Sequence, residues 1–199
     1  IRKGTLEIGA PVKEAVLSEQ LGISRAPIRE ALQVLVQEGL ITSEPQKGKH
    51  VRQMTGKEIY DSYVVAGILE GAGVAESLPL WTEANMETFR SVVRQMEGKI
   101  SYATKLDELA EIDELFHATL FMACDNTRLV EMARTSCATI SKYLYYQHWI
   151  TMFTPREYAD RHHAVAEAVY SRDVKHVETA LRDHYKETGL RMAQFGKEA

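Results

Sequence analysis

Four side chains that can bind a metal ion occupy core-facing positions in helical sequence patterns. Asp113 and His117 are one helical turn apart and fall on or beside the apolar stripe of "ELAEIDELFHATLFMA" (residues 108–123). His162 and His184 each share a helix face with apolar residues of later segments. A desolvated carboxylate is costly unless it is paired or bound to a cation. Three imidazoles and one carboxylate suit zinc, nickel or a similar divalent ion, so we predict a metal site, with a buried hydrogen-bond network as the alternative.

The remaining histidines are weaker ligand candidates. His163 follows His162 directly, so its side chain should point about 100° away, toward the surface or behind the ligands. His148 and His176 are weaker candidates as well.

A metal-dependent helical-bundle enzyme is the alternative function. Glu114 and His117 form one Glu-x-x-His unit of the kind that di-iron bundles contain. A second unit is absent, because the residues three positions before the other histidines considered are Ala159, Leu181 and Tyr145. No nucleophile with a base and an orienting group is recognisable either, so we predict no catalytic residues and no enzyme activity.

A second group of residues has the chemistry of nucleic-acid binding. In "LGISRAPIREALQVLVQEGL" (residues 21–40), Arg25 and Arg29 are one turn apart on a helix for which Ser24 is the expected N-cap. The basic stretch Lys47-Gly48-Lys49 forms the tip of an expected hairpin. Arginines in the first turns of such a helix can bind guanine or phosphate in the major groove, and a basic hairpin can reach the DNA backbone or the minor groove.

Turn and capping signals divide the chain into two parts. Residues 12–21 and 25–38 are predicted as helices and are followed by a hairpin, which together make a helix-turn-helix with a wing. After that the pattern is purely helical, with helices expected at about 55–78, 82–98, 105–124, 127–151, 155–171 and 173–194. We therefore predict a mainly α protein, with a winged helix-turn-helix domain over residues 1–54 and an all-α helical bundle over residues 55–199.

Composition and charge agree with this division. The 199 residues are 45% hydrophobic and 26% charged, as in a soluble globular protein, with a net charge of -4. Residues 1–52 contain 8 basic against 6 acidic residues, whereas the rest contains 16 against 22. The most apolar run, "YVVAGILEGAGVA" (residues 63–75), is broken by Glu70, so we expect a cytoplasmic protein with no membrane partner. Cys124 and Cys137 lack metal or redox spacing and are expected to be reduced thiols.

The segment "LSEQLGISRAPIREALQVLVQEGLI" (residues 17–41) resembles the winged-helix signature of the GntR family of bacterial transcription regulators. The resemblance implies that Arg25 and Arg29 contact bases or phosphates of a double-stranded DNA operator. It also implies that Lys47 and Gly48 form the contact between the wing and the DNA. Helix-turn-helix proteins usually bind two half-sites with two-fold symmetry, so a homodimer is expected.

Four later segments are similar to the C-terminal effector domain, called the FCD domain, of the FadR-type branch of this family. They are "DELFH" (113–117), "NTRLVE" (126–131), "HHAVAEAV" (162–169) and "LRDHY" (181–185). The resemblance implies a ligand-responsive transcription regulator. In metal-binding members the ligands are an Asp and a His on one helix and one His on each of two later helices, which match Asp113, His117, His162 and His184.

Three departures from the family pattern qualify the expected function. Ala15 stands where many members have a basic residue, and the first helix of the family would begin well before Ile1, so a trimmed N-terminus is expected. Ala66 stands where many members have a pocket-side arginine. A bound ion with open coordination positions should therefore provide most of the attraction for a small organic acid, with Tyr146 and His148 as its expected side-chain contacts.

Overall fold

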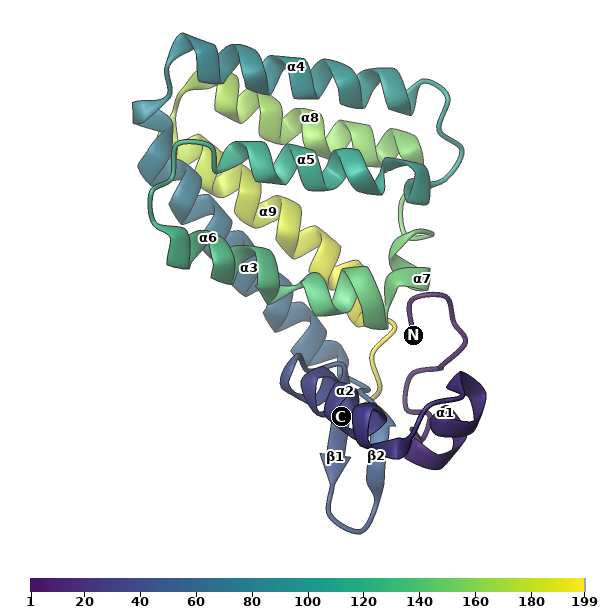
Figure 1. The fold of residues 1–199 in the computed structure, drawn as a ribbon. Helices are drawn as coiled ribbons and strands as arrows, with labels where there is room; N and C mark the ends of the chain where they lie inside the picture. Colours follow the sequence, from purple (N-terminus) through teal and green to yellow (C-terminus); the bar gives the residue numbers. More distant parts are fainter. Residues whose placement is uncertain (199) are drawn as a thin grey trace.

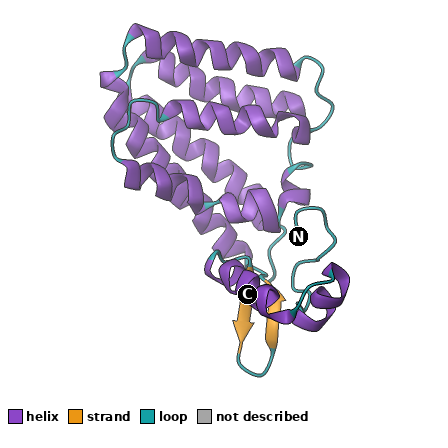
Figure 2. Cartoon of the chain, viewed as in Figure 1, coloured by secondary structure: helices purple, strands orange, loops and turns teal. Residues whose placement is uncertain are grey.

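The computed structural model describes residues 1–198 and shows a small lobe attached to one end of a larger helical bundle (Figures 1 and 2). The small lobe contains α1 (Glu14–Leu21), α2 (Arg25–Gln37), β1 (Ile41–Glu44) and β2 (Gly48–Val51). The two strands are antiparallel, with Ile41 opposite Val51 and Glu44 opposite Gly48. The fold of this lobe is the predicted helix-turn-helix with a wing.

Glycines end both helices of the small lobe. Gly22 follows α1 with a φ of 66° and Gly39 follows α2 with a φ of 73°, a left-handed conformation that favours glycine. Ile28 and Leu32 are buried on the inner face of α2. Ser24 occupies the predicted N-cap position with an extended backbone, but its side chain makes no capping hydrogen bond.

The bundle consists of six longer helices and several short helical segments. The longer helices are α3 (Gly56–Ser77), α4 (Glu83–Ile100), α5 (Ala110–Leu120), α6 (Thr127–Ser136), α8 (Pro155–Ser171) and α9 (Val174–Ala193). The short segments are the 3-10 helices η1 (Leu78–Leu80) and η2 (Leu106–Leu109), the π-helix η3 (Ile140–Leu144) and α7 (Tyr146–Trp149). Capping boxes begin α3, α4 and α8, because a threonine side chain and the polar side chain three residues later bond each other's backbone N–H groups.

The helices α3 and α9 cross at very short range because of glycines. A Cβ atom on Gly67 would lie 2.8 Å from Cβ of Tyr185, and one on Gly189 would lie 2.8 Å from Cβ of Tyr63. The stretch Gly56–Leu80 is long and apolar enough to cross a membrane by composition alone, but half of its most apolar window is buried inside the bundle. In this fold the stretch forms a helix of the bundle core.

The predicted helix over residues 127–151 is wrong as a continuous element. Instead, α6 ends at Ser136, a π-helix follows, and α7 contains only four residues. In the last turn of α6 the hydroxyl groups of Thr135 and Ser136 bond backbone carbonyls one turn earlier. The predicted helix at 105–124 likewise begins as a 3-10 turn and becomes α-helical only at Ala110.

The two lobes share a hydrophobic core. Ile28 and Leu32 of α2 belong to the same buried cluster as Tyr63, Ile140 and Leu144 of the bundle. The connection between the lobes is also hydrogen-bonded to the bundle through Tyr145, a buried residue between η3 and α7. Its hydroxyl accepts a hydrogen bond from the backbone N–H of Met54 at 3.0 Å and donates one to the Met54 carbonyl at 3.2 Å. A structural change in this segment of the bundle would therefore reach the winged helix through packed side chains.

Candidate functional site

Three histidines from three helices converge inside the bundle. His117 on α5, His162 on α8 and His184 on α9 place their ligand nitrogens within 4.8 Å of one another. Asp113, one turn before His117, adds a carboxylate oxygen 3.2 Å from Nε2 of His162. The fold thus brings together all four residues that the sequence analysis proposed as metal ligands.

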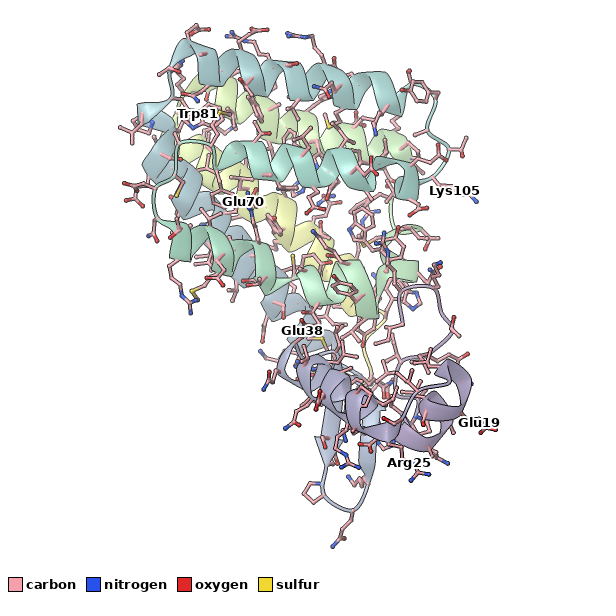
Figure 3. All side chains as sticks on the ribbon, in the orientation of Figure 1. Glu19, Arg25, Glu38, Glu70, Trp81 and Lys105 are labelled. Atoms are coloured by element: carbon pink, nitrogen blue, oxygen red, sulfur yellow. The ribbon has the colours of Figure 1, made fainter. Side chains whose placement is uncertain are left out.

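Hydrogen bonds behind the cluster orient two of the imidazole rings. Nδ1 of His117 donates to Oε1 of Glu70 at 2.6 Å, and Oε2 of Glu70 accepts from the hydroxyl of Tyr185 at 2.7 Å. Nδ1 of His162 donates to the backbone carbonyl of Tyr158 at 2.8 Å. A histidine that donates through Nδ1 keeps the Nε2 lone pair for a ligand, and a carboxylate behind a metal-binding histidine is a common arrangement. Glu70, labelled in the middle of the bundle in Figure 3, is only 3% exposed.

Within residues 1–198, two nitrogens of the cluster are buried without a hydrogen-bond partner. They are Nε2 of His162 and Nδ1 of His184. Oδ1 of Asp113 lies near Nε2 of His162 but does not form a hydrogen bond with it. A buried polar atom with no partner costs about 1 to 3 kcal/mol. Unpartnered imidazole nitrogens beside a carboxylate fit a divalent cation, so the residues present are consistent with a metal site.

The electrostatic environment keeps most of these ligands in the protonation states that bind a cation. Burial lowers the pKa of His162, and burial together with the positive charge of Arg161 lowers the pKa of His184 well below its usual value. Burial alone would raise the pKa of Asp113, but His162 and His117 outweigh burial and lower it. For His117, burial lowers the pKa, but the Glu70 carboxylate more than offsets this and raises it to about 9. A metal ion would therefore have to displace a proton from His117 at neutral pH.

The histidine cluster forms part of the wall of a cavity of about 280 Å³. Tyr146 lines this cavity, as the sequence analysis expected, and its hydroxyl contacts the carboxylate of Asp107. His148 is not among the lining residues, and its ring stacks on Phe195 with the ring centroids 4.1 Å apart. Two residues along a helix correspond to a rotation of about 200°, so Tyr146 and His148 face different sides of α7. The structure therefore places only Tyr146 of these two residues at the cavity wall.

The cavity is also lined by a partly buried arginine that the sequence analysis did not identify. The side chain of Arg161 is 12% exposed and lines the cavity. Its Nε donates to Oε2 of Glu187 at 2.8 Å, and its Nη2 donates to the hydroxyl of Thr188 at 2.6 Å. Its guanidinium carbon lies 4.1 Å from the ring centroid of Phe153. A guanidinium group therefore lies beside the cavity although Ala66 on α3 takes the place of the arginine expected from the family pattern.

The predicted DNA-contacting arginines lie on the small lobe. Arg25 is the first residue of α2 and lies at the end of the molecule away from the bundle (Figure 3). Arg29, one turn later, is paired with an acidic residue of α1. Its Nε and Nη2 donate to Oε2 of Glu14 at 3.2 and 3.1 Å, and the other oxygen of Glu14 accepts from Nζ of Lys49 at 3.0 Å. Glu14 therefore links α2 to the wing and would compete with DNA for these two cations.

The tip of the wing is open to solvent. The side chain of Lys47 is 74% exposed and pairs with Glu44 at 2.7 Å. Gly48 has a φ of 82°, and no atom lies within 4 Å of the position that a Cβ would occupy there. The tip of the wing therefore presents an exposed lysine and an unobstructed glycine, and their contact with DNA stays a prediction.

Some of the site residues that the sequence analysis missed had a recognisable sequence signal, and others had none. Glu70 was visible as the one acidic residue in the apolar run of residues 63–75, which is itself a sign of a buried polar contact. Arg161 gave no such signal, since it lies in a charged stretch beside His162. Glu14 is 15 residues from Arg29 in the chain, so only the crossing of α1 and α2 reveals their contact.

Both parts of the chain match known protein families. Residues 1–51 match the family model described as "Bacterial regulatory proteins, gntR family", and residues 61–187 match the FCD domain. The HTH-type transcriptional repressor RspR of Escherichia coli (strain K12) is 26% identical over 193 residues, which cover 96% of this chain and 82% of the repressor. The Nta operon transcriptional regulator of Aminobacter aminovorans is 28% identical over 156 residues, which cover 77% of this chain and 70% of that protein.

Solved structures share the fold. E. coli McbR/YncC aligns with a TM-score of 0.72 and 20% identity over 97% of this chain and 91% of its own. A GntR family member from Pseudomonas syringae pv. tomato str. DC3000 aligns with a TM-score of 0.59 and 22% identity over 97% and 79%. These families and relatives are transcription regulators, not enzymes. The chain therefore belongs to the gntR family of bacterial regulatory proteins and is a DNA-binding transcription regulator in which a gntR-type winged helix is joined to an FCD effector-binding domain.

Proposed function

We propose that the effector domain of this regulator binds one divalent metal ion, zinc or nickel, through Asp113, His117, His162 and His184. The observation that carries the proposal is the convergence of three imidazoles, two of which have buried nitrogens without hydrogen-bond partners. Such an ion would supply a positive charge at the wall of the cavity.

The effector in this proposal is a small organic acid that binds in the cavity beside the metal site. The cavity has about 280 Å³, which suits a small molecule better than a long acyl chain. Tyr146 is its proposed aromatic contact. His148 is left out, because its ring lies against Phe195 outside the cavity.

At the other end of the molecule, Arg25 and Arg29 are the proposed contacts to operator bases or phosphates. Ser24 at the start of the recognition helix, and Lys47 and Gly48 at the wing, would contact the DNA backbone. The protein would act as a homodimer on two half-sites, in the cytoplasm, with the domain boundary between residues 54 and 55. The acid would regulate DNA binding if it favours one spacing of the two winged helices over another.

Metal analysis of variants tests the ligand set. Elemental mass spectrometry of purified wild-type protein should find about one zinc or nickel per chain. His184→Ala and Asp113→Asn should lose the metal and melt at lower temperature, because an ion that binds only the folded state stabilises it. His163→Ala is the matched control, since the side chain of His163 is 42% exposed beside Glu97. A requirement for His163 instead of His162 would contradict the proposed set.

Two further experiments test the regulatory function. In titration calorimetry, removal of the metal with a chelator should abolish the binding of small carboxylic acids, and undiminished binding would show that the effector site lies elsewhere. Operator sequences can be selected from a random duplex library with the purified protein. Fluorescence anisotropy on a selected duplex, with and without the acid, then measures the coupling, and sedimentation measures the oligomeric state.

A further inference from the structure

After its last helix the chain returns to the connection between the two lobes. The segment Phe195–Lys197, which we call the tail segment, follows α9 and runs back to the small lobe (Figure 1). Lys197 pairs in parallel with Thr55. Its backbone N–H donates to the carbonyl of Met54 at 2.9 Å, and its carbonyl accepts from the backbone N–H of Gly56 at 3.4 Å. Gly56 is the first residue of α3, so the tail segment also provides an acceptor for an N–H group that a helix leaves free at its start.

Two glycines bring the tail segment into direct backbone contact with this connection. A Cβ atom on Gly196 would lie 2.2 Å from the backbone nitrogen of Gly56 and 2.6 Å from its Cα. A Cβ atom on Gly56 would lie 2.6 Å from the backbone oxygen of Ala193. These distances are too short for a carbon atom, so a side chain at either position would force the two backbones apart.

The segment that follows η3 holds the same connection from another side. The carbonyl of Met54 accepts hydrogen bonds both from the N–H of Lys197 and from the hydroxyl of Tyr145. The ring of His148 on α7 stacks on the ring of Phe195, with the ring centroids 4.1 Å apart and an interplanar angle of 15°. The tail segment and α7 therefore contact each other as well as the connection.

Both holding segments lead directly from the cavity. His184 and Thr188 of α9 line it, and so do Ser141 and Lys142 of η3. The chain passes from β2 to α3 through residues 52–55, so the backbone around Met54 is where the winged helix can turn against the bundle. Hinges of this kind are a few residues that absorb changes in φ and ψ. A shift of α9 relative to η3 would change the hydrogen bonds that hold this hinge.

We propose that the tail segment is a latch that fixes the orientation of the winged helix, and that metal binding in the bundle alters DNA binding by moving this latch. In the latched arrangement the N–H and carbonyl of Met54 and the N–H of Gly56 are all bonded to residues distant in the chain, so the hinge resists turning. The inference rests on the proposed function, because the ion that moves α9 is the one proposed to bind His184.

Amide hydrogen exchange of the metal-free full chain tests the latch itself. Lys197→Pro removes the N–H that bonds Met54, and Gly196→Ala forces the tail segment off the hinge. Lys197→Ala is the matched control, because it loses the same exposed side chain but keeps the N–H. Exchange at Gly56 should be faster in the two released variants and unchanged in the control. Thermal unfolding checks that each variant folds.

Anisotropy titrations of a selected operator duplex, with and without Zn²⁺, test the transmission. Zinc should change the operator affinity of wild type and of Lys197→Ala by about 5-fold or more, and that of Lys197→Pro and Gly196→Ala by less than about 2-fold. The affinity for zinc itself should be the same in all four proteins, because no proposed metal ligand belongs to the tail segment.

The outcomes separate this inference from the proposed function. A zinc effect on operator affinity that persists in both released variants would overturn the latch and leave metal-dependent regulation standing. Wild-type exchange at Gly56 in both released variants would also overturn it, and zinc binding without any effect on wild-type operator affinity would overturn the transmission. A protein that binds no zinc would refute the proposed metal site, and faster exchange at Gly56 together with altered operator affinity in the released variants alone would then still support the latch.

Discussion

The substitution Glu70→Gln tests whether the fold prepares His117 to bind a metal. In the native protein both carboxylate oxygens of Glu70 accept hydrogen bonds, one from Nδ1 of His117 at 2.6 Å and one from the hydroxyl of Tyr185 at 2.7 Å. Glutamine has the same shape, but it is neutral and carries an NH₂ group in place of one oxygen. If the NH₂ group faces His117, the ring must move or take the tautomer whose Nε2 carries the proton, and that tautomer cannot bind a metal through Nε2.

Zinc affinity should fall by about 10- to 100-fold in this variant, which corresponds to about 1.4 to 2.7 kcal/mol. Loss of the Glu70 charge also lowers the pKa of His117 and so weakens proton competition at neutral pH, which keeps the fall within this range. Glu70 is 3% exposed, so little water is available to replace the lost charge. The hydrogen bond to His117 is also short, as expected when one partner is charged.

Competition against a chromophoric chelator measures the affinity for zinc and for nickel. Glu114→Gln is the matched control, because Glu114 also lines the cavity but is 67% exposed and pairs with Lys142 at 2.9 Å. Thermal unfolding of the metal-free variants checks that both fold. Equal metal affinities in wild type, Glu70→Gln and Glu114→Gln would refute the argument that Glu70 orients a metal ligand.

Three further predictions concern the DNA face, the packing of α3 and the contact between the lobes. Arg29→Ala should weaken operator binding by about 1 to 3 kcal/mol and relax base specificity, whereas Lys47→Ala should mainly lower the salt dependence of the binding constant by about one unit of log–log slope. Anisotropy titrations at several salt concentrations measure both effects, and unchanged binding in both variants would exclude the proposed interface. Gly67→Ala should destabilise the fold by about 1 to 3 kcal/mol because its Cβ would press on α9, while Gly98→Ala, with free space around it in α4, should stabilise it by about 0.4 to 1 kcal/mol. Urea unfolding measures both, and equal effects would contradict the close crossing. Tyr145→Phe leaves the buried backbone N–H of Met54 unpaired, so it should lower the free energy of unfolding by about 1 to 3 kcal/mol and speed amide hydrogen exchange around residue 54. Wild-type exchange rates there would show that the contact does not stabilise the interdomain segment.

The sequence by itself determined the class of protein and singled out the residues proposed as metal ligands. The helix-turn-helix and wing could be predicted because their stops are local: a glycine that takes a positive φ after each helix, and a threonine with its capping partner at the start of α3. Asp113, His117, His162 and His184 could be proposed as ligands because polar side chains on apolar helix faces stand out from a 3.6-residue pattern. These signals depend on neighbours within a few residues in the chain, so no knowledge of the tertiary structure is needed to recognise them.

Only the tertiary structure decided which distant residues assist those ligands. Glu70 reaches His117 because glycines let α3 pack closely on α9 and so bring that helix to the cluster. Glu14 neutralises Arg29 because α1 crosses α2, and Arg161 faces the cavity although its neighbours in the chain are charged. The direction of a side chain at one helix position follows from its own sequence, but its partner is set by how separate helices pack, and that packing depends on the whole core at once.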